Sequence, residues 1–150
     1  MTNFVRATCL GALLLAGCAQ ACAADFEVKA LNRGTSGAFV FEPTFLKIAP
    51  GDKVTFKAVD ANHTVGTVRG MIPAGAQPFK SERSKDLTVT FATPGIYGYE
   101  CFVHIHSFGM SGLIVVGDDL SNMPAAKEAA ALAPPVERAK LEALLKQAGG

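Results

Sequence analysis

Four side chains that suit a transition metal lie within ten residues in the second half of the chain. Cys101 supplies a thiol, His104 and His106 supply imidazoles, and Met110 supplies a thioether. Sulfur and imidazole donors together favour copper, which can exist with either one or two positive charges. A further imidazole, His63, lies 38 residues before Cys101. The candidate site would therefore form only when the chain folds.

The metal-binding residues fall where a β-sheet could hold them. Residues 101–110 lie between two strand-like runs, at 96–100 and 113–116. A connection at one end of a sheet is a place where a rigid scaffold can aim ligands. We therefore expect residues 101–110 to form a loop across one end of a β-fold.

The first 24 residues have the pattern of a cleaved secretory signal. Arg6 precedes an apolar run at residues 7–16, and small residues precede Asp25. The run is too short for a membrane-spanning helix. Cys18 ends a sequence that resembles a bacterial lipobox, and its lipidation would anchor the protein to a membrane. We predict cleavage of residues 1–24 and a periplasmic domain over 25–150, with the lipid-anchored form as the alternative.

Export changes the meaning of the cysteines. Cleavage would remove Cys9, Cys18 and Cys22, and Cys101 would remain alone. A single cysteine cannot close an internal disulfide. Because histidines and a methionine lie beside it, we interpret Cys101 as a metal ligand rather than an inert buried thiol.

Charge and size exclude several classes of protein. Cleavage would remove one basic residue, Arg6, from the 14 in the chain, leaving 13 basic and 13 acidic residues and a formal net charge of zero. The sequence has neither an excess of positive charge nor an interleaving of basic and aromatic residues, so it does not indicate nucleic-acid binding. About 126 residues suit one domain with a substantial core.

The pattern after Asp25 predicts an all-β fold. Alternating or wholly apolar short runs are bounded by turn signals such as Pro50-Gly51 and Pro94-Gly95. Many short strands at this spacing favour an antiparallel sandwich. Residues 124–132 and 135–148 each begin with proline and are rich in Ala, Lys, Glu and Leu, which predicts two short helices at 124–148. The predicted strands are residues 26–32, 38–41, 45–48, 54–59, 64–68, 87–91, 96–100 and 113–116.

Several segments occur together and in order along the chain: Phe41-Glu42-Pro43, residues 49–56, residues 70–76, Pro94-Gly95-Ile96-Tyr97-Gly98-Tyr99 and the loop at 101–110. In these segments the chain resembles the pseudoazurins, which are exported blue-copper proteins of the cupredoxin superfamily. The resemblance covers nearly all of residues 24–150. It implies a cupredoxin-like Greek-key β-sandwich of about eight strands with two C-terminal helices.

The resemblance also implies a function. It implies one type 1 (blue) copper per chain, bound by His63, Cys101, His104 and Met110. The protein would carry single electrons by cycling between Cu(II) and Cu(I), without turning over a substrate of its own. The implied partners are a reductase such as copper nitrite reductase and a cytochrome as donor, and the implied oligomeric state is a monomer.

Two departures from the family pattern leave alternatives open. Five residues separate His104 from Met110 where the family has four, so His106 is the alternative to His104. Thr64 replaces the asparagine that usually follows the first histidine ligand. Residues outside the ligand set also have expected roles: an apolar patch beside the copper from Met71, Ile72, Ile105 and Phe108, and basic residues around it from Arg33 and Lys80.

Two other functions compete with electron transfer. A copper enzyme would need a second metal site with its own histidines, and all three histidines are accounted for near one site. A copper-handling or zinc-binding protein is the stronger competitor, because one thiolate and two or three imidazoles also satisfy tetrahedral zinc.

Overall fold

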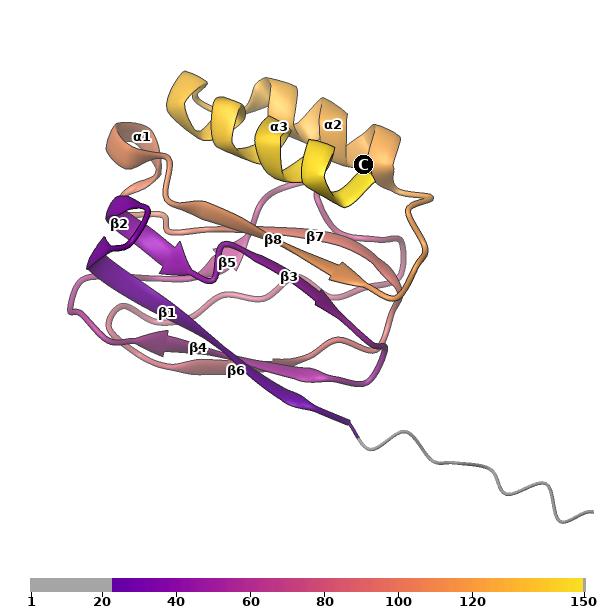
Figure 1. Cartoon of the computed structure of the whole chain (residues 1–150), viewed down its shortest axis with the longest axis horizontal. Coiled ribbons are helices and arrows are strands. Elements are labelled where there is room, and N and C mark those ends of the chain that lie inside the picture. The colour runs from indigo at the N-terminus through magenta and orange to yellow at the C-terminus, as the bar shows by residue number, and fades with distance from the viewer. Residues whose placement is uncertain (1–22, 150) are drawn as a thin grey trace, which may run out of the picture.

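The computed structural model describes residues 23–149 as two stacked β-sheets with helices over one of them (Figure 1). The expected export signal and the lipobox cysteine Cys18 fall on residues 1–22, outside the described residues. The strands are β1 (Asp25–Gly34), β2 (Gly37–Glu42), β3 (Phe45–Ile48), β4 (Lys53–Ala58), β5 (Gly66–Thr67), β6 (Leu87–Thr90), β7 (Gly95–Glu100) and β8 (Ser111–Val116). The helices are α1 (Ile105–Phe108), α2 (Met123–Leu132) and α3 (Pro135–Gly149).

Each sheet has four strands. One has the order β2-β1-β4-β6 and the other β3-β8-β7-β5. The predicted sandwich with two C-terminal helices is confirmed, but its strand pairing is mixed rather than wholly antiparallel. β1 pairs in parallel with β4, and β3 with β8. The chain crosses to the other sheet at β3 and returns at β4, so β4 runs in the same direction as β1 when it pairs with it.

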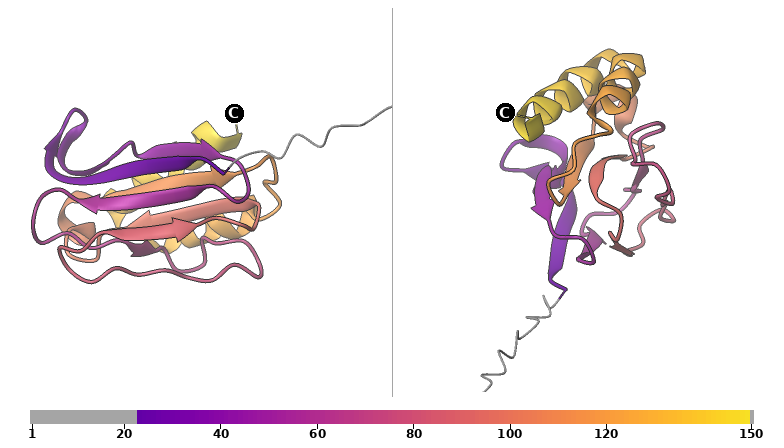
Figure 2. Two further views of the ribbon diagram at one scale, coloured as in Figure 1. Left: turned by 90° about the horizontal axis from the view of Figure 1, so that it is seen from below. Right: turned by 90° about the vertical axis from the view of Figure 1, so that its right-hand side faces the viewer.

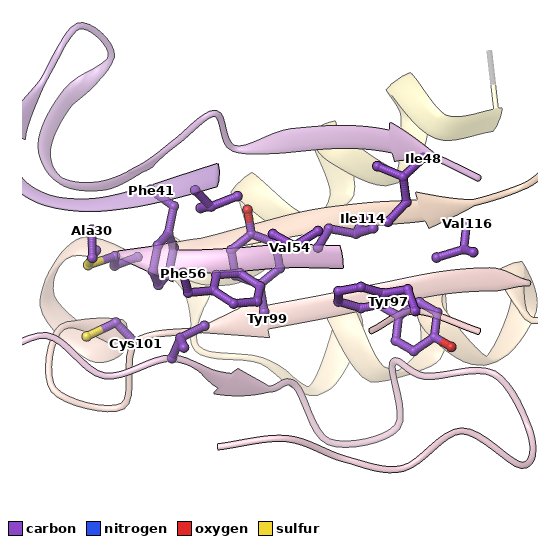
Figure 3. Close-up of a cluster of buried hydrophobic side chains, with 14 residues drawn as sticks. Ala30, Phe41, Ile48, Val54, Phe56, Tyr97, Tyr99, Cys101, Ile114 and Val116 are labelled. Atoms are coloured by element: carbon purple, nitrogen blue, oxygen red, sulfur yellow. The ribbon is translucent and has the colours of Figure 1, made fainter. Parts of the chain in front are cut away.

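Apolar side chains fill the space between the two sheets, and Cys101 lies at one end of this core. Phe41, Phe56 and Tyr99 pack edge to face, with ring centroids 5.0 Å apart in both pairs that include Tyr99. Cys101 is fully buried in this cluster, at the end where Ala30 and Phe41 lie, and Tyr97 lies toward the other end (Figure 3). The candidate ligand therefore extends the hydrophobic core instead of lying on the surface.

The C-terminal helices cover the outer face of the second sheet (Figures 1 and 2). Leu141, Leu144 and Leu145 of α3 pack in a second cluster with residues of β7 and β8. Because both faces of β8 are covered, all six of its residues are buried. Asn122 ties the start of α2 to β7, since its side chain accepts a hydrogen bond from Ile96 N–H and donates one to Ile96 C=O, both at 2.9 Å. β7 and β8 are thus held on two sides, and the metal-binding loop connects them.

Among residues 23–149, the structure contains no helix with the length and apolar character that crossing a membrane would require.

Candidate metal centre

The connections at one end of the sandwich bring the predicted metal-binding side chains together. Cys101 directly follows β7, and Met110 directly precedes β8. Both are fully buried. The Cys101 N–H donates a hydrogen bond to the Met110 carbonyl at 2.8 Å, which fixes the two ends of the loop beside each other. His63 lies between β4 and β5 and is only 1% exposed.

The geometry of three donors fits one metal ion. The Cys101 sulfur lies 3.9 Å from His63 Nδ1 and 3.5 Å from His104 Nδ1. The ligand atoms of these three residues all lie within 4.8 Å of one another. A metal about 2.3 Å from a thiolate and about 2.0 Å from an imidazole nitrogen, at an angle of roughly 120°, separates those two atoms by about 3.7 Å. The two observed sulfur–nitrogen distances lie on either side of that value, so each imidazole is placed to share a metal ion with the Cys101 sulfur.

Thr64 joins the two ligand-bearing segments. Its N–H donates to the Cys101 sulfur at 3.4 Å, and its hydroxyl oxygen lies 3.7 Å from the same atom. The hydroxyl oxygen also accepts a hydrogen bond from Phe102 N–H at 3.1 Å. A donor aimed at the sulfur stabilises negative charge there. Thr64 therefore joins the segment that follows His63 to the start of the loop at 101–110.

The ring of His63 is oriented by Asn32 on β1. His63 Nε2 lies 3.1 Å from Asn32 Oδ1. In the tautomer where Nε2–H donates to this oxygen, Nδ1 is unprotonated and faces the Cys101 sulfur. Burial, followed by repulsion from His104, lowers the pKa of His63. Both effects favour the neutral imidazole, which is the form that binds a metal.

His104 lies at the surface edge of the site. It is partly exposed and occupies the N-cap position of α1. Partial burial, and then the positive charge of Arg83, lowers the pKa of this imidazole. The ring of Phe39 stacks on it, with centroids 4.4 Å apart at an interplanar angle of 31°. His104 therefore joins the interior of the site to the surface.

The structure places His106 apart from the other donors. It is exposed in the last turn of α1 and is absent from the three-residue donor cluster. Burial raises the pKa of Glu100, and interactions with Glu137 and with His106 lower it in part. The second imidazole at the sulfur is thus that of His104.

A helical turn accounts for the length of the loop. Residues 105–108 form α1, which the sequence did not predict. Gly109 ends it in the left-handed conformation, with φ of +57°. A Cβ atom on Gly109 would lie 2.9 Å from backbone atoms of Val136 and Glu137. Glycine is required here both by conformation and by the close approach of α3.

Exposed apolar side chains lie in the same loop as His104. Phe102, Val103 and Phe108 are 39–42% exposed, and we call these three residues the apolar rim. Of the patch residues expected from the sequence, Phe108 is exposed and Ile72 is partly buried. Met71 and Ile105 are buried at 0% and 5% exposure, so that expectation is wrong for these two. Met71 lies under Gly98 of β7, and the helical form of α1 turns Ile105 inward.

Sequence reasoning missed two residues that contact the candidate ligands, Asn32 and Phe39. The only hint was local, because asparagine is disfavoured inside a strand and needs a reason to be there. Nothing in the sequence indicated that Phe39 would adopt a φ of +51°.

Comparisons with known proteins agree with this geometry. Residues 28–117 match the model for copper-binding proteins of the plastocyanin/azurin family. The chain is 46% identical to a putative pseudoazurin from Rhizobium leguminosarum and 42% identical to a pseudoazurin from Paracoccus pantotrophus. Each match covers 91% of the chain, and they cover 88% and 92% of those relatives. The crystal structure of pseudoazurin from Methylobacterium extorquens AM1 superposes with a TM-score of 0.77 at 36% identity, covering 82% of this chain and 98% of that one.

Proposed function

The chain belongs to the plastocyanin/azurin family of copper-binding proteins and is a blue-copper electron carrier of the pseudoazurin type, and we propose that it holds one copper ion through His63, Cys101, His104 and Met110. The observation that carries the ligand assignment is the convergence of the Cys101 sulfur and two Nδ1 atoms within 4.8 Å. Met110 is buried in the same cluster as Cys101 and would add a weak thioether donor to the set.

Bound copper supplies a one-electron couple between Cu(II) and Cu(I). The chain's part is to keep the ligands still while the charge changes. Asn32 orients His63, the Met110 carbonyl accepts from Cys101 N–H, and Thr64 donates to the sulfur. Since these partners are fixed by strands and buried packing, little needs to move when an electron arrives. Because the ligands and their surroundings reorganise little, one-electron transfer is fast. Such a carrier needs no substrate-binding site.

Electrons enter and leave through His104. Its imidazole is the partly exposed member of the candidate ligand set, and the three exposed residues of the apolar rim lie in the same loop. A partner that covers the rim expels water and brings its own redox centre close to the imidazole edge. The buried residues Cys101, His63 and Met110 offer no comparable route to the surface.

The redox partner has a negatively charged surface, in the manner of a copper nitrite reductase, with a cytochrome as the electron donor. Three exposed cations near this end of the molecule support the proposal. The ammonium group of Lys80 lies 4.9 Å above the centre of the Phe102 ring, Arg83 is close enough to His104 to lower its pKa, and Arg33 lies on β1. Opposite charges across an interface accelerate encounter more than they tighten the complex.

The periplasm is the proposed location. The expected export signal at residues 1–24 supports it. The domain over 25–150 would then function as a soluble monomer, unless Cys18 carries a lipid.

Electron-transfer kinetics test the partner assignment. Stopped-flow mixing of the reduced protein with a copper nitrite reductase should give a second-order rate that falls as salt increases. The double variant Lys80→Glu/Arg83→Glu should lower the rate at low salt and weaken its salt dependence. The control is Lys47→Glu. Lys47 lies on β3, away from the apolar rim, and pairs with Asp118. Equal rates for wild type and the double variant would reject charge-assisted docking at this face.

A further inference from the structure

We propose that the groove between α2 and residues 68–70 binds a small organic cation, a primary ammonium group carried on an alkyl stem. The ammonium group would bind the carboxyl groups of Glu100 and Glu137 in the groove, and the stem would lie along α2. The proposal does not depend on copper, because no residue that lines the groove belongs to the candidate ligand set or to the apolar rim.

Glu137 supplies the observation that points to a ligand. It lies in the first turn of α3, and its side chain is only 1% exposed. Its Oε1 atom is buried and accepts no hydrogen bond from the part of the chain that the structure describes. Leaving a buried carboxyl oxygen without a partner costs free energy. The groove therefore lacks a donor that a ligand could supply.

Further charges in the groove favour a cation. Glu100 ends β7, and its carboxyl group lies within hydrogen-bonding reach of that of Glu137. Glu128 of α2 also lines the groove and is exposed. Arg69 is the basic residue in the lining, and within residues 23–149 it forms no salt bridge with these acids. Three acidic side chains and one basic side chain give the groove a negative potential.

An ammonium group matches the chemistry of the carboxyl pair. Burial, and then the neighbouring Glu100, raises the pKa of Glu137 to about 8. Negative charge on Glu137 is therefore disfavoured when no positive group is near. An ammonium group carries one positive charge and three N–H donors. It would offset that charge and donate a hydrogen bond to the free Oε1 atom.

The walls of the groove suit an alkyl stem. The groove has a volume of about 820 Å³, which lies within the range of about 300–1,000 Å³ that is typical of sites for small organic ligands. Long aliphatic chains bury their methylene groups on apolar surface while their charged end reaches a polar partner. The apolar side chains of the walls are Val68, Ala125, Ala129, Ala131, Leu132 and Ala133.

A metal ion fits the groove less well. Among the described residues, the cluster of three metal-binding side chains is that of His63, Cys101 and His104. Glu100 and Glu137 thus have no third histidine, cysteine or carboxylate placed to complete a metal site. A hydrated ion would also leave the apolar walls in contact with water, whereas an alkyl stem would cover them.

The test is calorimetric titration of the reduced, copper-loaded protein with hexylamine at about pH 8.5. The amine keeps its proton at this pH, because the pKa of an alkylammonium group is about 10.4. The soft Cu(I) ion prefers sulfur donors and competes little for an amine. We expect one hexylamine per chain, with nuclear magnetic resonance shifts in α2 and in residues 68–70. Each methylene removed from the amine should weaken binding by up to about fourfold.

Substitutions of the carboxyl groups locate the site. Glu137→Gln keeps the shape of the side chain and removes its charge, and it should weaken hexylamine binding about tenfold or more. Glu100→Gln should also weaken binding, and it keeps the test valid if Glu137→Gln fails to fold. The matched control is Glu142→Gln, the same change at an exposed position of α3, which should leave the affinity unchanged.

Several results would overturn the proposal. One is equal hexylamine affinity in wild type, Glu137→Gln and Glu100→Gln, and another is methylamine binding as tightly as hexylamine. Displacement of hexylamine by Ca²⁺ or Zn²⁺ would assign the groove to a metal ion. Binding of a lysine-containing peptide without binding of hexylamine would assign it to a protein partner. The metal-free protein should bind hexylamine as tightly as the copper-loaded form, and a requirement for copper would also reject the proposal.

Discussion

Replacing Asn32 by alanine should weaken metal binding although Asn32 is not itself a ligand. The substitution removes the Oδ1 atom that lies 3.1 Å from His63 Nε2. The main-chain N–H of Asn32 donates to Asp60 Oδ2 at 2.6 Å, and alanine keeps that bond. The perturbation is therefore confined to the acceptor that orients His63.

Two effects set the size of the change. His63 is 1% exposed, so loss of the acceptor leaves a buried N–H without a partner, at a cost of about 1–3 kcal/mol. Removing a partner that orients a metal-binding histidine typically lowers metal affinity about 10- to 100-fold. That range corresponds to about 1.4–2.8 kcal/mol, since each factor of ten is about 1.4 kcal/mol. The range from the unpaired N–H group and the range from metal affinity therefore overlap.

The assay is a copper titration against a competing chelator, together with urea unfolding of the metal-free protein. Asn32→Asp is the matched control, because it keeps an oxygen at the same place on an exposed residue, where an added charge should cost little. We expect Asn32→Ala to lose affinity and stability and Asn32→Asp to retain most of both. If Asn32→Ala bound copper as tightly as wild type, His63 would not depend on Asn32 for its orientation.

Three further predictions concern the loop and the helix packed on it. His104→Gly should lose the blue colour and regain it with added imidazole, whereas His106→Gly should keep the wild-type spectrum; the reverse result would exchange their roles. Met110→Leu should stay blue and raise the midpoint potential by on the order of 60 mV, a tenfold shift toward Cu(I), because an electron donor to the oxidised ion is lost; a large fall would show that Met110 is not axial. Burial and the neighbouring Glu100 raise the pKa of Glu137 to about 8 from 4.5, so the folded protein holds a proton at pH values where the unfolded chain has released it. The resulting stability is present below about pH 4.5 and is lost as the pH rises toward 8, by on the order of a few kcal/mol. Urea unfolding of Glu137→Gln should show a flatter pH dependence than wild type over that range, and an unchanged slope would mean that the carboxyl pair does not couple to folding.

The chemistry of the site could be predicted from the sequence because soft donors are rare and were concentrated in ten residues. Cys101, His104 and Met110 are close along the chain, so any loop across a sheet end would keep them near one another. The two C-terminal helices could also be predicted from the sequence, because each begins near a proline and continues with residues such as alanine and leucine that favour helices. Their observed bounds, Met123–Leu132 and Pro135–Gly149, differ from the prediction by one residue at one end of each helix.

Features that depend on contacts between distant segments could not be predicted. Spacing alone did not decide between His104 and His106. The choice depends on the helical turn α1, which begins after His104 and contains His106, and Gly109 at its end packs against α3. The parallel pairing of β1 with β4 depends on where the chain crosses between sheets. The roles of Asn32 and Phe39 depend on the β1–β2 ladder, in which these two residues are not paired with each other. No local sequence pattern predicts this gap. The proximity of Glu100, at the end of β7, to the buried Glu137 of α3 also depends on such a contact.

The measurement that tests the central claim most directly is the visible absorption spectrum of the purified protein with one equivalent of Cu(II), beside Cys101→Ser prepared in the same way. The proposed site predicts an intense thiolate-to-copper charge-transfer band in wild type that a mild reductant bleaches and an oxidant restores. The serine variant should keep the β-fold and lack the band. A faint ligand-field band in wild type, or copper loss with thiol oxidation, would contradict the assignment of Cys101 as a copper ligand and favour a metal-handling role.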